Sequence, residues 1–587
     1  MSSFRFSPRP NRANEIKWVE WGDAAFAQAR QRDVPVLLAI SAVWCHWCHV
    51  MDETSYSTED IIRMINEGYV AIRVDNDERP DVNRRYNMGG WPTTAFLAPS
   101  GEIIHGGTYV PPEEMFRTLL AVSELWSTQK DDIQRRVTEA SEKESAARAS
   151  NPGELAREIV DGVRAHILGQ YDREHGGFGH EPKFPQTSVL RFVLSEYRRH
   201  GAPELATVLR TTLDAMSAGG MYDHVEGGFF RYATLRDWTV PHYEKMLEEN
   251  AELIAIYADA HATFPDAGYD AVVRDVIRWM DASLFQPENG LWSGSQDADE
   301  HYYTLDADER AKHDAPFVDR TLYTSWNVLA AGAYLNAGEV LKDKDIALRG
   351  WTAIDAIGER LRDKAGALCR YDAGRGPEVS GLLGDSAAFL ALLAGAGKLP
   401  EATALAARMR DTLEDHERGG FFDRPAGLAP GRLARRERPI EENSTAASGL
   451  LSLAVRTGDE SWREIALRAL RSFAGEYRAW GQFAASYADV VARALRGPLS
   501  IVVVGRMGDP AAEVLWRAAR SSGDPDATVQ HLDPAVVGEL VTARGFPLDR
   551  TAAYLCLGTT CSAPLTDEGS LRRELDSAHE RRVSQTA

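Results

Sequence analysis

The chain has 587 residues, more than one hydrophobic core normally supports, so we expect two or more domains. Its formal net charge of −21 disfavours nucleic-acid and anionic membrane partners, because both are bound mainly through clustered lysine and arginine. No apolar run approaches the roughly 20 residues that span a bilayer, and the first residues lack the core of a signal peptide. These features predict a cytoplasmic protein.

The first segment alternates short apolar runs with amphipathic stretches, a rhythm that predicts an α/β domain. The run that opens at Pro35 is short and apolar throughout, as expected of a buried central strand. The predicted elements are a helix over 23–30, a strand over 34–41, a helix over 58–69, strands over 70–77 and 93–99, a hairpin within 101–112 and a helix over 113–126.

A cysteine pair, Cys45 and Cys48, follows the predicted central strand where a helix begins. Backbone amides and the helix dipole stabilise a thiolate on the first cysteine of such a pair. Cys45 would then attack a disulfide, and Cys48 would resolve the mixed disulfide. Two alternatives remain: a fold without thiol turnover, or metal binding with His46 and His49. No metal is predicted, because structural zinc usually takes its ligands from two separate elements.

Four segments carry a family resemblance: CHWCHVM, DNDERPDVN, GGWPTTAFLAPSG and GGTYVPPE, in this order. With them the chain resembles the thioredoxin-domain family that includes spermatogenesis-associated protein 20. The resemblance implies a thioredoxin fold over residues 1–126, with Pro92 as a cis-proline opposite the cysteines. Trp91 and Trp44 would shape the groove for a thiol or disulfide partner protein, or for a reductant. No cofactor is expected.

A change of character follows this segment. Residues 127–153 are charged and nearly free of large apolar side chains, so we expect an exposed helical linker that ends at Asn151, Pro152 and Gly153. Over residues 154–496, apolar residues recur at three- and four-residue spacing and predict about twelve helices.

A turn in which glycine precedes a large side chain punctuates these helices at intervals of 51 to 76 residues. One interval fits one helical hairpin, and six hairpins that close on themselves form an (α/α)6 toroid. The family resemblance implies the same fold, which sugar epimerases of the N-acylglucosamine type and many glycoside-processing enzymes share. The six turns stand at Gly177, Gly228, Gly290, Gly366, Gly420 and Gly481.

The loops at these turns are rich in residues suited to proton transfer and sugar binding. Epimerases of this fold use histidines, so His224 and His242 are catalytic candidates with Glu244 as a partner, whereas glycosidases use two carboxylates. Each candidate also has a structural reading, in a turn, in the core or in a surface pair. The candidate ligand-binding residues are Lys183, Tyr222, Asp223, Arg231, Tyr232, Trp238, Asp297, Asp299, Trp326, Asn327, Asp385, Glu441 and Asn443.

Residues 497–587 predict a small α/β appendage of strand, helix and strand. Gly505 and Gly508 follow its first strand, but the segment lacks a dinucleotide or P-loop fingerprint. Cys556 and Cys561 are expected to be chance thiols; the alternative is a second dithiol that relays electrons to the first pair.

Three functions fit the sequence. The first is a thiol–disulfide redox protein whose toroid recognises a partner or a sugar, and this prediction requires an accessible sulfur and a closed ring of helices. The second is a carbohydrate-active enzyme, an epimerase or hydrolase, with a regulatory or vestigial thioredoxin module. The third is a non-enzymatic binding scaffold.

Overall fold

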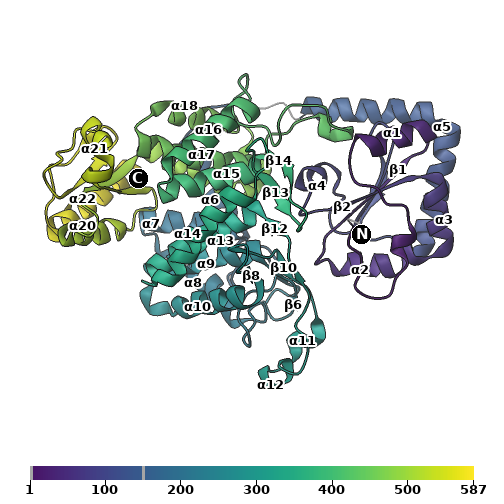
Figure 1. The fold of residues 1–587 in the computed structure, drawn as a ribbon, viewed down its shortest axis with the longest axis horizontal. Helices are drawn as coiled ribbons and strands as arrows, with labels where there is room; N and C mark the ends of the chain where they lie inside the picture. Colours follow the sequence, from purple (N-terminus) through teal and green to yellow (C-terminus); the bar gives the residue numbers. More distant parts are fainter. Residues whose placement is uncertain (1–3, 148–151, 587) are drawn as a thin grey trace.

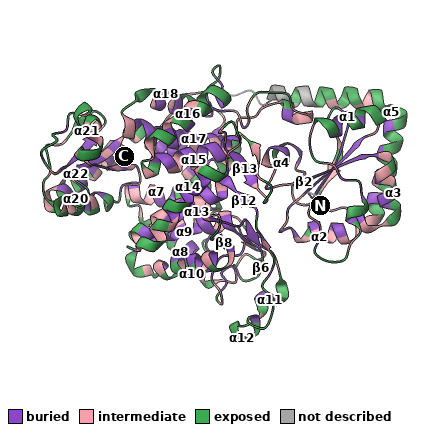
Figure 2. Ribbon diagram, viewed as in Figure 1, coloured by how far each residue is buried: buried purple, intermediate pink, exposed green. Residues whose placement is uncertain are grey.

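The computed structural model describes residues 4–147 and 152–586, so Asn151 of the predicted linker lies outside the described residues. An N-terminal α/β part and a C-terminal α/β part lie on opposite sides of a large helical ring (Figure 1). Helix α5 (Pro112–Ala147) runs along the N-terminal part and continues through most of the predicted linker. It is exposed along most of its length, whereas burial concentrates in the ring and the sheets (Figure 2).

The N-terminal part has the thioredoxin fold. Its sheet has the order β2-β1-β3-β4, with β1 parallel to β2 and antiparallel to β3. Strand β1 is a continuous apolar run because helices cover both faces of the sheet. The elements are α1 (Asp23–Arg32), β1 (Val36–Ser41), α2 (His46–Glu53), α3 (Glu59–Gly68), β2 (Val70–Asp75), α4 (Pro80–Tyr86), β3 (Thr93–Leu97) and β4 (Ile103–Gly107).

The central part is an (α/α)6 ring, as the six turns predict. Six inner helices contact one another in sequence order, and the last contacts the first, so the ring closes. The inner helices are α7 (Thr187–His200), α9 (Leu247–Thr263), α13 (Thr324–Val340), α15 (Leu383–Ala396), α17 (Ile440–Thr457) and α19 (Ala485–Arg496). The outer helices are α6 (Arg157–Gln170), α8 (Pro203–Ala218), α10 (Tyr269–Trp279), α14 (Lys344–Arg360), α16 (Leu399–Leu413) and α18 (Glu460–Arg471).

Each recurring glycine turn leads from an outer helix to the next inner helix. All six glycines have positive φ, between 53° and 84°, and a Cβ on Gly228 would lie 2.7 Å from the Trp279 ring. In three repeats an asparagine of the inner helix bonds both the N–H and the carbonyl of the turn residue. These asparagine–turn pairs are Asn250 with Phe229, Asn327 with Trp292, and Asn443 with Phe421.

Short strands and two short helices occupy the connections of the ring, and β12, β13 and β14 lie between its helices and the thioredoxin part (Figure 1). They are β5 (Tyr232–Ala233), β6 (Pro241–His242), β7 (Lys245–Met246), β8 (Phe285–Gln286), β9 (Leu291–Trp292), β10 (Ser295–Gln296), α11 (Glu300–Thr304), α12 (Ala307–Arg310), β11 (Val318–Asp319), β12 (Leu322–Tyr323), β13 (Cys369–Asp372) and β14 (Pro377–Ser380).

The C-terminal part repeats the strand order and directions of the thioredoxin sheet. Its order is β16-β15-β17-β18, with β15 parallel to β16 and antiparallel to β17. The loop that corresponds to the cysteine pair, directly after β15, contains Gly505 and Gly508 and no cysteine. The elements are β15 (Leu499–Val504), α20 (Pro510–Arg520), β16 (Ala527–Leu532), α21 (Pro534–Ala543), β17 (Ala552–Leu557), β18 (Thr560–Cys561) and α22 (Glu568–Thr586).

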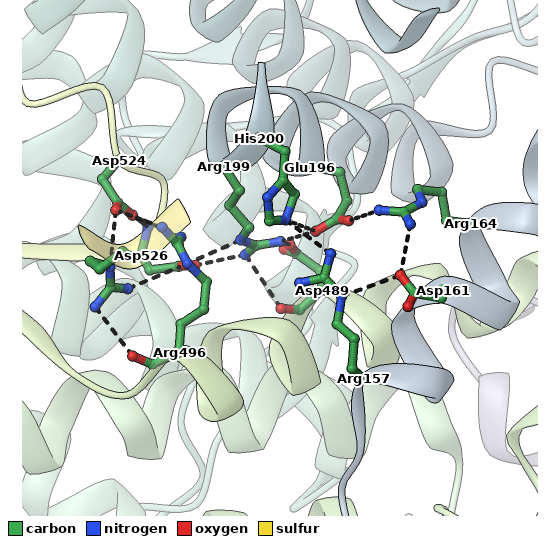
Figure 3. Close-up of polar contacts among 11 residues, drawn as sticks. Arg157, Asp161, Arg164, Glu196, Arg199, His200, Asp489, Arg496, Asp524 and Asp526 are labelled. Atoms are coloured by element: carbon green, nitrogen blue, oxygen red, sulfur yellow. Dashed lines mark hydrogen bonds and ion pairs between the residues drawn. The ribbon is translucent and has the colours of Figure 1, made fainter. Parts of the chain in front are cut away.

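A buried network of ion pairs joins this C-terminal part to the ring (Figure 3). Asp526, just before β16, pairs with Arg199 of α7 at 2.6 Å and with Arg496 of α19. Asp524 pairs with Arg496 at 3.1 Å. Because these charges are buried and mutually paired, the network fixes how the C-terminal part sits on the ring.

Candidate functional site

Cys45 and Cys48 form a disulfide where α2 begins, with their Cα atoms 5.2 Å apart. Cys45 is the N-cap residue, and the Cys48 N–H donates to its sulfur at 3.2 Å. The peptide bond between Trp91 and Pro92 is cis, as the family resemblance implies. The local arrangement of the cysteine pair is therefore the one predicted from the sequence.

The expectation of an accessible sulfur is wrong. Cys45 is 5% exposed and Cys48 is 3% exposed, and both belong to the same hydrophobic cluster as the inner helices of the ring. The ring covers the face of the thioredoxin part that carries the disulfide. A folded protein partner therefore cannot reach the pair while the two parts stay in contact.

Arg231 of the ring lies against the tryptophans beside the cysteine pair. Its guanidinium carbon is 3.8 Å from the centre of the Trp44 ring and 5.6 Å from that of Trp91. The Trp44 Nε1–H donates to Asp77 at 2.7 Å, and the Arg231 N–H donates to the Glu244 carbonyl at 2.8 Å. Three predicted binding residues thus meet across the interface between the two parts.

A second arginine, Arg370, crosses the same interface. Its Nε–H donates to the Asp77 carbonyl at 2.8 Å, and its guanidinium pairs with Asp385 at 3.2 Å. Burial raises the pKa of Asp385, although Arg370 opposes the shift. Asp385 is a predicted binding residue, whereas Arg370 and Asp77 were not predicted because they stand in ordinary strand and loop sequence.

A cavity of about 470 Å³ lies between the thioredoxin part and the ring, and Cys48 lines it. Asp297, a predicted ligand-binding residue, lines it from the ring, and Glu78 lines it from the thioredoxin part. Burial raises the pKa of both carboxyls to about 7. Charged and apolar side chains also line this cavity, among them Arg5, Phe6, Glu20, Trp21, Arg73, Asp75, Arg79, Phe317, Arg375, Glu378 and Val379.

Next to Asp297 stands a histidine–carboxylate pair. His242 Nδ1 and Glu244 Oε2 are hydrogen-bonded, and the His242 ring stacks on Tyr232 with centroids 4.8 Å apart. Glu244 is fully buried, and its Oε1 has no hydrogen-bond partner among the described residues. Burial is the largest cause of the raised pKa of Asp297, and the charge of Glu244 raises this pKa further. The structure thus brings together four predicted residues.

Carboxylates also gather in the first turns of two inner helices, Glu248 and Glu249 in α9 and Glu441 and Glu442 in α17. Burial raises the pKa of Glu249 and of Glu441 to about 7. Glu442 pairs with Arg84 of the thioredoxin part. Of these four, Glu441 is a predicted binding residue. Acidic residues in a first turn are also the common complement to a helix dipole.

Several predicted binding residues are instead parts of buried ion pairs. Lys183 bonds Asp172 at 2.8 Å, and Lys245 bonds Asp223 at 2.6 Å, at equivalent places in consecutive repeats. Asp223 also pairs with Arg310 at 2.8 Å. These charges neutralise one another in the interior, and ligand binding by Lys183 and Asp223 stays a prediction.

Other predicted residues also have internal partners. Asn327 and Asn443 are buried and bond the glycine turns, and their role in ligand binding stays a prediction. Trp326 is buried. Trp238 donates to the His175 carbonyl at 2.9 Å, and Tyr222 donates to Asp275 at 3.2 Å. Asp299 caps the N-terminus of α11. His224 is exposed, and its ring contacts the Gly219 carbonyl at 3.1 Å.

The expectation that Cys556 and Cys561 are chance thiols is wrong, whereas the electron relay stays a hypothesis. Cys556 and Cys561 form a second disulfide between β17 and β18. It lies in the C-terminal part, on the opposite side of the ring from Cys45 and Cys48 (Figure 1).

The chain is similar to one family model and to several known proteins. Residues 8–144 match the family model Thioredox_DsbH, described as "Protein of unknown function, DUF255". Human spermatogenesis-associated protein 20 is 36% identical over 312 residues, covering 49% of this chain and 39% of that protein. Uncharacterized protein B0495.5 of Caenorhabditis elegans is 33% identical over 307 residues, covering 49% and 42%. The matched region thus spans about two fifths of these relatives.

Among solved structures, D-mannose isomerase is similar with a TM-score of 0.45 and 13% identity, covering 56% of this chain and 88% of that one. In the described part of the chain, no helix is both long and apolar enough to cross a bilayer. The fold and site define a thioredoxin-like protein whose disulfide-bearing face is closed by an (α/α)6 ring. Residues 8–144 match this thioredoxin-like family model, and about half of the chain is similar to spermatogenesis-associated protein 20 of human and mouse.

Proposed function

We propose that the chain is a thiol–disulfide redox protein whose Cys45–Cys48 pair exchanges electrons with a small thiol inside the interdomain cavity. The observation that carries the proposal is that Cys48 is among the residues that line this cavity, whereas Cys45 is not. A reducing compartment such as the cytoplasm would supply the thiol. A small thiol can enter the interdomain cavity, whereas the ring keeps a folded protein away from the cysteine pair.

The exchange has two steps. The thiolate of the small thiol attacks Cys48, the Cys45–Cys48 bond breaks, and Cys45 leaves as a thiolate that the Cys48 N–H stabilises. The thiolate of a second small thiol attacks the sulfur of the first small thiol in the mixed disulfide. The bond to Cys48 breaks, which releases the Cys48 thiolate and a small disulfide. Two thiols are oxidised, the pair gains two electrons, and the two thiol protons are available to the cysteines. Cys45 and Cys48 thereby exchange the roles that the sequence predicts.

Trapping of the two half-reactions tests this assignment. Cys45→Ser should accumulate a mixed disulfide on Cys48 when a small disulfide is added, whereas Cys48→Ser should react more slowly through its covered Cys45. Mass spectrometry of the peptide that contains both positions reads the result. Equal labelling of the two variants would refute the order of attack, and no labelling of either would refute redox exchange.

A second candidate function is carbohydrate processing, as an epimerase or hydrolase. The specific observation in its favour is the His242–Glu244 pair beside Asp297, a set of groups suited to proton transfer. A screen of sugars and oligosaccharides with His242→Ala and Cys45→Ser tests it. Loss of sugar turnover in His242→Ala alone would support this candidate, and no turnover by the unmodified protein would eliminate it.

A further inference from the structure

The arginines of the interdomain cavity are already neutralised. Each of the four that line it lies within 4 Å of a carboxylate, so none is left to bind an anionic ligand. The pairs are Arg5 with Asp319, Arg73 with Asp52 at 2.8 Å, Arg79 with Asp81 at 2.8 Å, and Arg375 with Glu378 at 3.5 Å.

The carboxylates of the cavity are in excess. Glu20, Asp75, Glu78 and Asp297 line it, and none of them forms an ion pair with a cation of the described residues. Within the described part of the chain, the Asp75 carboxylate accepts only backbone N–H groups, from Asp77 at 2.8 Å and from Glu78 at 3.2 Å. The pKa of Glu78 and of Asp297 stands at about 7 because burial disfavours their charges more than the nearby arginines favour them. These arginines are Arg5 and Arg375 for Glu78 and Arg9 for Asp297.

A fully buried, unpartnered acceptor that is not itself a lining residue acts on one of these carboxylates. Glu244 Oε1 has no hydrogen-bond partner among the described residues, and the charge of Glu244 acts on Asp297. Apolar side chains form another part of the cavity wall, with Phe6 stacked against the Arg73 guanidinium at 4.7 Å. The other apolar lining residues include Trp21, Phe317 and Val379. The cavity therefore suits a small ligand with a short apolar body and a positive charge.

We propose that this cavity selects aminothiols, small thiols that carry a protonated amine, over neutral and anionic thiols. The inference rests on the proposed redox function and names its substrate class. The ammonium group lies among Glu78, Asp75 and Asp297, and the thiolate of the same molecule reaches Cys48. The two electrons still come from two thiols, which leave as one disulfide.

Rates of reduction of the Cys45–Cys48 disulfide by three matched thiols test the selection. The probes are 2-aminoethanethiol, 2-mercaptoethanol and mercaptoacetate, with each rate constant expressed per concentration of thiolate. We expect the cationic thiol to react about tenfold faster than the anionic one, as electrostatic steering into a charged cleft allows. Alkylation and mass spectrometry of the peptide that contains Cys45 and Cys48 separate this disulfide from Cys556–Cys561.

Charge-neutral variants provide the control. Glu78→Gln and Asp297→Asn should each reduce the cation-to-anion rate ratio, whereas Glu67→Gln, an exposed residue of α3 in the same domain, should leave it unchanged. Comparing each ratio between variants cancels the intrinsic reactivity of the thiols. If a variant fails to fold, raising the salt concentration on the unmodified protein should shrink the ratio instead.

The outcomes separate the two proposals. Equal rates for all three thiols would overturn aminothiol selection and leave redox exchange standing. Failure of all three thiols to reduce the pair in the folded protein would overturn both.

Discussion

The guanidinium carbon of Arg231 lies 3.8 Å from the centre of the Trp44 ring, and this contact joins the helical ring to the residue directly before Cys45. The N–H of Arg231 donates to the Glu244 carbonyl, so Arg231 also holds the strand that carries His242. One residue therefore links the covered disulfide to the His242–Glu244 pair.

Arg231→Ala should loosen the cover over the cysteine pair. A cation–π contact of this kind contributes about 0.5–2 kcal/mol, enough to raise the population of an opened interface several-fold. We expect faster iodoacetamide labelling of the reduced Cys45 and Cys48 in the folded variant. Arg63→Ala, in an exposed part of α3, serves as the control. Unchanged labelling in Arg231→Ala would show that the contact does not hold the cover.

Glu78→Gln should change the pH dependence of stability. The raised pKa of Glu78, about 7, means that its contribution to stability is complete below its ordinary pKa of about 4.3 and is lost as pH rises through 7. The variant avoids this loss, so its Tm advantage over the unmodified protein should grow from pH 5 to pH 8. Thermal melts at the two pH values measure it, and a constant difference would contradict the burial of this charge.

Asp526→Asn should weaken the attachment of the C-terminal part. Burial alone would raise the pKa of Asp526, but Arg199 and Arg496 outweigh it and hold the pKa well below its usual value. The contribution to stability is therefore present above about pH 4 and is lost as pH falls through the lowered pKa. At neutral pH the variant leaves arginines unpaired, which costs about 3–5 kcal/mol.

Hydrogen exchange in β16 measures that effect. We expect faster exchange in Asp526→Asn at pH 7, and no change in Asp549→Asn, an exposed residue of the same part. Native-like exchange in Asp526→Asn would mean that the ion network of Figure 3 does not fix this interface.

Asn443→Ala should destabilise the ring without altering thiol exchange. Asn443 accepts from the Phe421 N–H at 2.6 Å and donates to the Phe421 and Pro439 carbonyls. Each buried group left unpaired costs about 1–3 kcal/mol. Asn250→Ala, at the equivalent place of another repeat, should lower the Tm similarly. A changed exchange rate with an unchanged Tm would favour the predicted ligand-binding role of Asn443 over a structural role.

Local patterns in the sequence predict the fold well. Cys45 and Cys48 after an apolar run define the start of α2, and the recurring glycines define the six repeats of the ring. Both signals depend on residues close together in the chain. The asparagine–turn bonds were not predicted, because Asn250 and Phe229 are 21 residues apart and no local pattern connects them.

The site is less predictable, because it forms where two parts of the chain meet. Burial of Cys48 depends on inner helices that follow it by more than a hundred residues. Arg370 and Asp77 stand in ordinary strand and loop sequence, 293 residues apart. The repeated topology of the C-terminal sheet was also missed, since its loop after β15 lacks the cysteines that mark the N-terminal one.

Redox titration of the folded, full-length protein tests the central claim most directly. The protein is equilibrated with graded ratios of a small thiol and its disulfide, and the free thiols at Cys45 and Cys48 are then trapped and counted by mass spectrometry. The account predicts one reversible two-electron transition at these two cysteines while the ring stays folded. A disulfide that resists every ratio until the protein unfolds would contradict it.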